Sequence, residues 1–236
     1  MPSWPACPSA MKLILFGATG MIGGGALREA LAAPGVECVV VIGRRSCGFT
    51  HPKLQELLLP DLYEVASVAP RLADFDACLW GLGVSVVGMD EAAYAEVTEA
   101  LTLAWARALL ALHPPGTFSF CYCSAAGAGG NAMWARVRQR VENALRALPF
   151  RHAGVVRPAM IQPGPGIRSQ VRAYRLAIAA VRPLMPLLVR TWPAMFTTSE
   201  KLGRAMLRVL EGKADRFTLE STDINRLGAP PWDTAG

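Results

Sequence analysis

The chain has 236 residues, of which 52% are apolar and 18% are charged, so it is long enough to bury a sizeable core in one domain. This composition excludes a disordered tail and a highly charged scaffold. The net charge of +6 is compatible with anionic partners such as phosphates. The basic residues are dispersed and no aromatic-basic module accompanies them, so we expect no nucleic-acid partner.

The six cysteines and the first ten residues bear on the cellular compartment of the protein. Four cysteines lie in apolar runs, which is typical of small buried side chains, and no spacing suggests a disulfide framework or a metal site. Residues 1–10 lack the basic start and apolar stretch of a secretory signal. We therefore expect a cytoplasmic protein, a monomer or homodimer, with residues 1–10 as a disordered extension before a single domain over residues 11–236.

Apolar and β-branched runs predict six strands that alternate with helices over residues 11–157. The strands are expected at 12–16, 37–42, 54–59, 77–80, 117–123 and 152–156, and the helices at 21–33, 63–72, from Asp90 to Leu112, and at 132–148. The third helix has the clearest pattern, because Tyr94, Val97, Leu101 and Trp105 recur at steps of three and four residues. This alternation favours an α/β fold, a Rossmann-like, doubly wound parallel sheet.

The pattern changes after residue 158. A loop at 163–166 is followed by a mixed stretch at 168–196, a helix at 199–211 and a possible edge strand at 216–220. We expect residues 159–227 to form a short C-terminal cap on the same domain. Within it, residues 171–196 combine arginines with large apolar groups, as an interfacial helix does, but Pro183, Pro186 and Pro193 interrupt any long helix. A substrate-covering cap or a dimer surface is favoured over peripheral membrane association, and no stretch is long enough for a stable membrane span.

A glycine-rich loop lies directly between the first strand and the first helix. Its residues are Gly17, Ala18, Thr19, Gly20, Met21, Ile22 and Gly23. A tight turn, a close backbone approach to a pyrophosphate and helix–strand packing each require glycine there, and the helix N-terminus supplies N–H groups to an anion. The alternative is a glycine-rich turn without a ligand, but the strand–loop–helix context favours nucleotide binding.

Three segments carry a family resemblance: LILFGATGMIGGGALREAL, MWARVRQRVENALRALPF and RPAMIQPGPGIRSQVRAYR. Over residues 11–227 the chain resembles the atypical branch of the short-chain dehydrogenase/reductase superfamily, the NAD-dependent epimerase/dehydratase-like or Tat-interacting-protein-like oxidoreductases. The resemblance implies a nicotinamide dinucleotide and a small-molecule substrate.

The end of the second strand bears on the choice of cofactor. An acidic residue there would bond the ribose 2′-hydroxyl of NAD, but the chain has Arg44, Arg45 and Ser46, which suit a 2′-phosphate. NADP(H) is therefore favoured over NAD(H), the alternative being an ordinary solvated turn. The resemblance further implies cofactor contacts by residues after the later strands, namely Asp61, Leu62, Gly81, Leu82, Gly83 and Pro158.

The family's catalytic pair does not match. Relatives place a tyrosine and, four residues later, a lysine on the helix after the fifth strand, where this chain has Trp134 and Arg138. Tryptophan cannot exchange a proton at neutral pH, so the usual acid–base catalyst is absent from its position. Arg138 can still bond ribose hydroxyls, because that role needs only hydrogen-bond donors. We expect Arg138 beside the nicotinamide ribose and Trp134 near the nicotinamide.

Two further residues are candidates for catalysis. Ser124 ends the fifth strand, where relatives place a serine that polarises a substrate carbonyl, although a turn hydroxyl is an equal alternative. Tyr174 is a candidate replacement for the missing proton donor. Two functions remain open: an NADP(H)-dependent oxidoreductase on a small carbonyl or alcohol, and a non-catalytic dinucleotide-binding redox sensor or scaffold.

Overall fold

The computed structural model describes residues 10–162 and 191–230. The expected disordered extension lies outside these ranges except for Ala10. The catalytic candidate Tyr174 and most of the apolar-basic stretch at 171–196 also lie outside them.

Seven strands form one parallel sheet in the order β3-β2-β1-β4-β5-β6-β9. They are β1 (Met11–Phe16), β2 (Val36–Gly43), β3 (Leu54–Leu58), β4 (Ala77–Trp80), β5 (Ser119–Cys123), β6 (Ala153–Arg157) and β9 (Thr218–Glu220). The predicted Rossmann-like, doubly wound parallel sheet is confirmed, and each predicted strand forms within two residues of its predicted bounds. The strand order reverses at β1 and β4, which are neighbours at the centre of the sheet.

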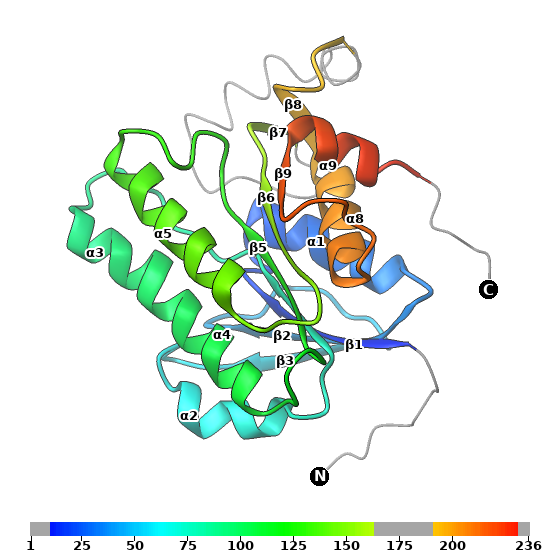
Figure 1. Cartoon of the computed structure of the whole chain (residues 1–236). Coiled ribbons are helices and arrows are strands. Elements are labelled where there is room, and N and C mark those ends of the chain that lie inside the picture. Colours follow the sequence, from blue (N-terminus) through cyan, green and yellow to red (C-terminus); the bar gives the residue numbers. More distant parts are fainter. Residues whose placement is uncertain (1–9, 163–190, 231–236) are drawn as a thin grey trace.

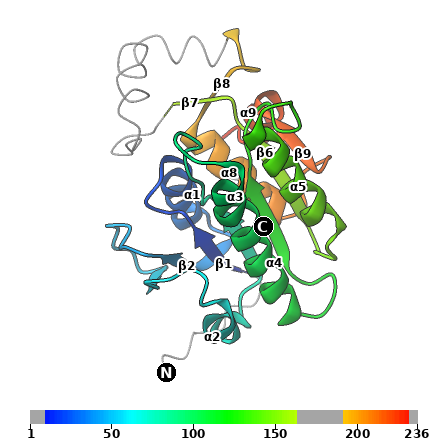
Figure 2. The ribbon, with the colours of Figure 1, turned by 90° about the vertical axis from the view of Figure 1, so that its left-hand side faces the viewer.

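Helices cover both faces of the sheet (Figures 1 and 2). One face carries α1 (Met21–Ala32), α8 (Ser199–Leu210) and α9 (Ser221–Leu227). The other carries α2 (Val65–Val68), η1 (Ala69–Leu72), α3 (Glu91–Ala95), η2 (Glu96–Ala100), α4 (Leu101–Ala111) and α5 (Met133–Ala147). Leu13 and Leu15 of β1 pack on the first face and Ile14 and Phe16 on the second, so β1 reads as a continuous apolar run.

The predicted helix from Asp90 to Leu112 forms, but a π-helical turn at η2 interrupts it. Asp90 caps its start, since its carboxylate accepts a hydrogen bond of 2.8 Å from the backbone N–H of Ala93. Within this turn Thr98 is buried and Val97 only partly so, whereas the sequence pattern predicts Val97 on the buried side. The predicted helix at 63–72 is shorter and divides into α2 and η1.

The C-terminal region divides between a separate small sheet and the main fold. β7 (Met160–Gln162) pairs with β8 (Phe196–Thr198) outside the main sheet, as Figure 1 shows. α8 instead packs against α1: a Cβ on Gly203 would lie 3.0 Å from the Cα of Ala26, so glycine allows the two helices to approach. Part of the region expected to be a cap therefore completes the main core. In the part of the chain that the structure describes, no helix has the length and apolar character that a bilayer crossing needs.

Candidate active site

The carboxyl ends of the strands meet at one edge of the sheet, because every strand pair is parallel. The loops after β1 and β4 lie side by side there, at the point where the strand order reverses, and open α/β sheets bind their ligands at this point. The backbone N–H of Gly81 donates to the carbonyl of Phe16 at 3.0 Å, which ties the two loops together.

Three glycines allow this close packing. Gly17 has φ +84°, and a Cβ added there would lie 2.5 Å from the carbonyl carbon of Gly81. A Cβ on Gly23 would lie 2.2 Å from the carbonyl oxygen of Gly17, and one on Gly81 would lie 3.2 Å from the Cα of Gly23. Since all these neighbours are backbone atoms, side chains cannot be accommodated. The loop thus leaves a bare backbone surface at the start of α1, as a pyrophosphate requires.

Among the residues that the structure describes, no side chain caps the N-terminus of α1. Its N-cap, Gly20, has no side chain to accept from the first turn, and that turn contains no acidic residue. The free N–H groups and the helix dipole therefore favour an anion at this end. Together with the glycine packing, this fits the diphosphate of a dinucleotide.

The side chains that follow β2 differ in whether they already have hydrogen-bond or ion-pair partners. Arg44 and Arg45 are exposed, and neither guanidinium has a hydrogen bond or an ion pair within the described ranges. Ser46 is engaged, because its hydroxyl donates to Oε2 of Glu56 at 2.9 Å. Partial burial alone would raise the pKa of Glu56, but hydrogen bonds from Cys47 and Ser46 lower it, so it is a carboxylate at neutral pH. Ser46 would have to exchange this partner to bond a phosphate.

A small cavity brings several of the predicted cofactor residues together. Residues from four separate loops and the end of β2 line it: Gly17, Ala18, Thr19, Val41, Ile42, Gly43, Arg44, Arg45, Leu62 and Leu82. Asp61 lies beside it, where its side chain accepts a hydrogen bond of 2.9 Å from the backbone N–H of Tyr63. The side chain of Leu62 is buried and forms an apolar wall, as an adenine requires.

Arg138 lies at the same edge, between the ends of β4 and β5. Its Nε donates to the hydroxyl of Tyr94 at 3.0 Å and its Nη1 to the carbonyl of Cys123 at 3.3 Å. Its Nη2 lies 3.7 Å from the place that a Cβ on Gly83 would take. Trp134, one turn earlier on α5, packs over Gly127 in the loop after β5. The sequence identified Arg138 and Gly83 but assigned Tyr94 only to the core, since nothing in its spacing reveals a polar contact across two helices.

The side chains around Arg138 are neutral. Burial raises the pKa values of Tyr122 and Cys123, that of Cys123 to about 12, although Arg138 acts in the opposite direction on both. Burial alone would lower the pKa of Arg138, but Tyr122, Tyr94 and Cys123 raise it. Arg138 therefore stays a cation at neutral pH, and neither Tyr122 nor Cys123 supplies an ionised base there.

Ser124 and Pro158 follow β5 and β6 at this edge. The Oγ of Ser124 is buried and has no hydrogen-bond partner in the described part of the chain. A buried hydroxyl without a partner is unusual in a folded protein, and a bound ligand is one way to satisfy it. Pro158 is buried, and its carbonyl accepts from the backbone N–H of Ala126 at 3.1 Å, which anchors the loop after Ser124.

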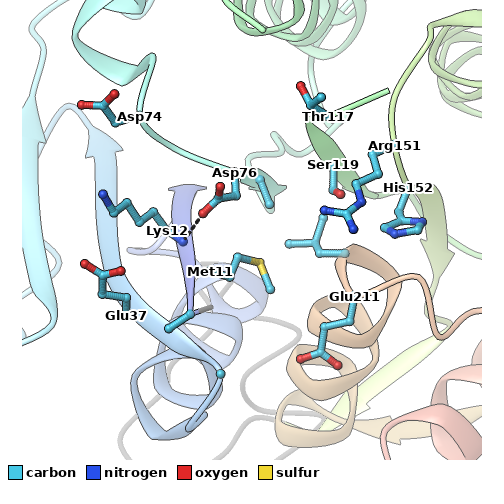
Figure 3. Close-up of a pocket in the computed structure, with 14 residues that line it drawn as sticks. Met11, Lys12, Glu37, Asp74, Asp76, Thr117, Ser119, Arg151, His152 and Glu211 are labelled. Atoms are coloured by element: carbon cyan, nitrogen blue, oxygen red, sulfur yellow. Dashed lines mark hydrogen bonds between the residues drawn. The ribbon is translucent and has the colours of Figure 1, made fainter. Parts of the chain in front are cut away.

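A cavity of about 610 Å³ lies at the opposite edge, where the strands begin (Figure 3). Lys12, Glu37 and Asp76 line one side, and Arg151 and His152 the other. None of the predicted site residues borders it. Among residues 10–162 and 191–230, no group of three or more histidine, cysteine or acidic side chains is placed to hold a metal ion.

Solved structures with the same arrangement of elements are dehydrogenases and epimerases. A short-chain dehydrogenase/reductase-family oxidoreductase from Burkholderia thailandensis has a TM-score of 0.65 and 17% identity, with 89% of this chain and 90% of that chain covered. The chain shares the Rossmann-like fold of this protein. A second protein with this fold, a short-chain dehydrogenase from Burkholderia cenocepacia in complex with NADP, has a TM-score of 0.62 and 16% identity, with 92% of each chain covered.

The same fold occurs in the enzyme WbmH of Bordetella bronchiseptica, solved in complex with NAD+. Its TM-score is 0.61 at 19% identity, with 86% of this chain and 72% of that chain covered. Proteins with this fold thus bind either dinucleotide, and the fold alone does not distinguish NADP(H) from NAD(H). No protein-family model matches the chain.

Two curated fungal proteins are similar in sequence. The mitochondrial protein FMP52 of Chaetomium globosum is 29% identical, with 94% of this chain and 99% of the relative covered. The mitochondrial protein fmp52-1 of Aspergillus oryzae is 28% identical, with 71% and 72% covered. These relatives contradict the expectation of a cytoplasmic protein. That expectation was wrong because buried thiols and the absence of a secretory signal do not distinguish the cytosol from a mitochondrial compartment.

Proposed function

We propose that this chain is an NADP(H)-binding oxidoreductase that acts on a small carbonyl or alcohol substrate. One observation carries the proposal: the glycine loop, the uncapped start of α1 and two unpaired arginines meet at the switch point of a parallel sheet. This arrangement offers a bare backbone to a diphosphate and positive charge to a 2′-phosphate.

The chain's own residues have distinct roles in this proposal. The loop from Gly17 to Gly23 holds the diphosphate, Leu62 and Leu82 enclose the adenine, and Arg44 and Arg45 bond the 2′-phosphate. Arg138 bonds the nicotinamide ribose, and Ser124 donates a hydrogen bond to the substrate oxygen. A bound nicotinamide dinucleotide supplies the hydride chemistry. The proton comes from Tyr174, from water or through a relay of ribose hydroxyls, since the indole of Trp134 exchanges no proton at neutral pH.

A second candidate function is a non-catalytic redox sensor or scaffold that binds the dinucleotide. Trp134 at the position of the family's tyrosine favours it, as do the neutral, buried side chains of Tyr122 and Cys123 beside Arg138. A screen of small carbonyl compounds with NADPH distinguishes the two functions. Consumption of NADPH with any substrate supports the oxidoreductase, whereas binding without turnover supports the sensor or scaffold.

The similarity to the FMP52 proteins supports a mitochondrial location, which we include in the proposal. Fractionation of cells that express the full-length chain tests it. A small molecule, not a nucleic acid, is the proposed partner, and the protein acts as a monomer or homodimer.

Replacement of Arg44 by alanine is expected to weaken NADPH binding about tenfold or more. One charged hydrogen bond to the 2′-phosphate contributes about 1.5–3 kcal/mol, and every 1.4 kcal/mol is a factor of ten in affinity. NADH lacks this phosphate, so its affinity should stay within about twofold. Titration of both cofactors by fluorescence measures the difference, and an equal loss for the two would show that Arg44 does not recognise the phosphate.

A further inference from the structure

Four side-chain contacts join the helix that begins at α3 to α5. At the two ends they are exposed ion pairs: Glu91 with Arg136 and Arg140, and Glu99 with Arg140, at distances of 2.8 to 3.2 Å. Between them lies the hydrogen bond from Nε of Arg138 to the hydroxyl of Tyr94. The middle contact differs from its neighbours because Tyr94 is only 2% exposed and contributes a phenol where they have a carboxylate.

Arg138 is consequently a cation whose partners in the described part of the chain are not carboxylates. Its two hydrogen-bond partners in the described part of the chain are a phenol and a backbone carbonyl, and no carboxylate there lies within ion-pair distance. Removing a cation from water without a carboxylate partner is costly, and proteins usually avoid it. Arg138 is partly buried, and its positive charge at this edge is available to a ligand.

Two hydrogen bonds fix the orientation of the Arg138 guanidinium. Tyr94 fixes Nε and the Cys123 carbonyl fixes Nη1, so the plane of the guanidinium is set by two bonds. The remaining nitrogen, Nη2, lies beside Gly83 and makes no hydrogen bond to the described residues. Gly83 follows β4 at the cofactor edge, so Nη2 faces the place where we put the nicotinamide ribose.

We propose that Tyr94 is a positioning residue, which orients Arg138 toward the nicotinamide half of the cofactor without neutralising its charge. A glutamate at position 94 would also hold the guanidinium, but it would cancel the positive charge. A phenylalanine would leave Nε unpaired and the guanidinium held only by the bond from Nη1 to the Cys123 carbonyl. The proposal rests on the proposed dinucleotide binding and adds to it a residue on a different helix from Arg138.

The test compares a whole dinucleotide with its adenosine half. Tyr94→Phe keeps the ring but removes the hydroxyl, and the probes are NADPH, NADH and adenosine 2′,5′-bisphosphate, each titrated by calorimetry. We expect NADPH and NADH to bind about five- to tenfold more weakly, since a hydrogen bond to a charged group is lost from the positioning of Arg138. Adenosine 2′,5′-bisphosphate lacks the nicotinamide ribose, so its affinity should not change.

Two further variants test whether Tyr94 acts on cofactor binding through Arg138. Arg138→Met should weaken both dinucleotides at least as much as Tyr94→Phe, and the double variant should be no weaker than Arg138→Met alone, because Tyr94 acts through Arg138. Glu91→Gln is the matched control: it removes the exposed ion pairs between α3 and α5 without touching Arg138, and its affinities should stay within about twofold.

The possible failures are distinguishable. An equal loss for all three probes in Tyr94→Phe would show a general loosening of the fold and overturn the inference. Independent, multiplying effects of Tyr94→Phe and Arg138→Met would also overturn it. A wild-type protein that binds NADPH but does not respond to Tyr94→Phe rejects the inference alone, whereas a wild-type protein that binds none of the probes rejects the proposed function and the inference with it.

Discussion

Replacement of Gly23 by alanine is expected to abolish measurable dinucleotide binding and to lower the free energy of unfolding by about 3 kcal/mol. The added Cβ would lie 2.2 Å from the carbonyl oxygen of Gly17 and 2.4 Å from its carbonyl carbon. Neither atom belongs to a flexible side chain, so the glycine loop and the start of α1 must separate. Chemical denaturation followed by circular dichroism gives the stability, and titration with NADPH gives the affinity.

Gly35→Ala provides the control for this experiment. A Cβ on Gly35, which lies just after α1, would have a single neighbour within 4 Å, Oε1 of Glu211 at 4.0 Å. Its effect on stability should stay within about 1 kcal/mol, with unchanged NADPH affinity. Wild-type affinity in Gly23→Ala would show that the close packing of the loop is not needed for the cofactor.

The combined replacement Trp134→Tyr with Arg138→Lys is expected to raise carbonyl reduction at least tenfold from a low baseline. Positioned acid–base groups contribute about 10²–10⁴-fold to such reactions, and a new pair on an unadapted helix should recover a part of this. Trp134 is half-buried on the side of α5 that faces the loop after β5, so a tyrosine hydroxyl has room at this place. Initial rates of NADPH oxidation with a panel of small aldehydes and ketones measure the gain.

Trp134→Phe and Arg138→Ala separate the two positions. Trp134→Phe should leave any turnover within a few-fold, because only packing over Gly127 changes. Arg138→Ala should weaken cofactor binding by about 1–3 kcal/mol if two ribose hydrogen bonds are lost. A collapse of turnover in Trp134→Phe at unchanged affinity would contradict a passive tryptophan. No gain in the restored pair, with the dinucleotide still bound, would favour the sensor or scaffold.

The sheet and the cofactor edge could be predicted because their signals are local. A buried parallel strand is apolar on both faces, and the glycine loop follows such a strand directly. The elements that the sequence did not predict are short: β7 and β8 have three residues each and α9 has seven, too few for a periodic pattern.

The remaining features that the sequence did not predict depend on contacts between residues far apart in the chain. Arg138 and Tyr94 are 44 positions apart, and no sequence pattern predicts their hydrogen bond. The engagement of Ser46 by Glu56 depends on the pairing of β2 with β3. The π-helical turn at η2, which contains the buried Thr98, has no signal in the period of the apolar residues around it.

The packing of α8 on α1 determines when this protein can fold. Arg204 of α8 and Glu29 of α1 form an ion pair at 3.0 Å although they are 175 positions apart. Leu202 and Met206 of α8 are fully buried in the core on this face of the sheet. A nascent chain that has left the ribosome only as far as residue 162 lacks the covering helices α8 and α9 and the outermost strand β9, so an apolar face of its sheet is open to water. Long-range closure of this kind is slow, and we expect the polypeptide to reach its native state only after synthesis is complete.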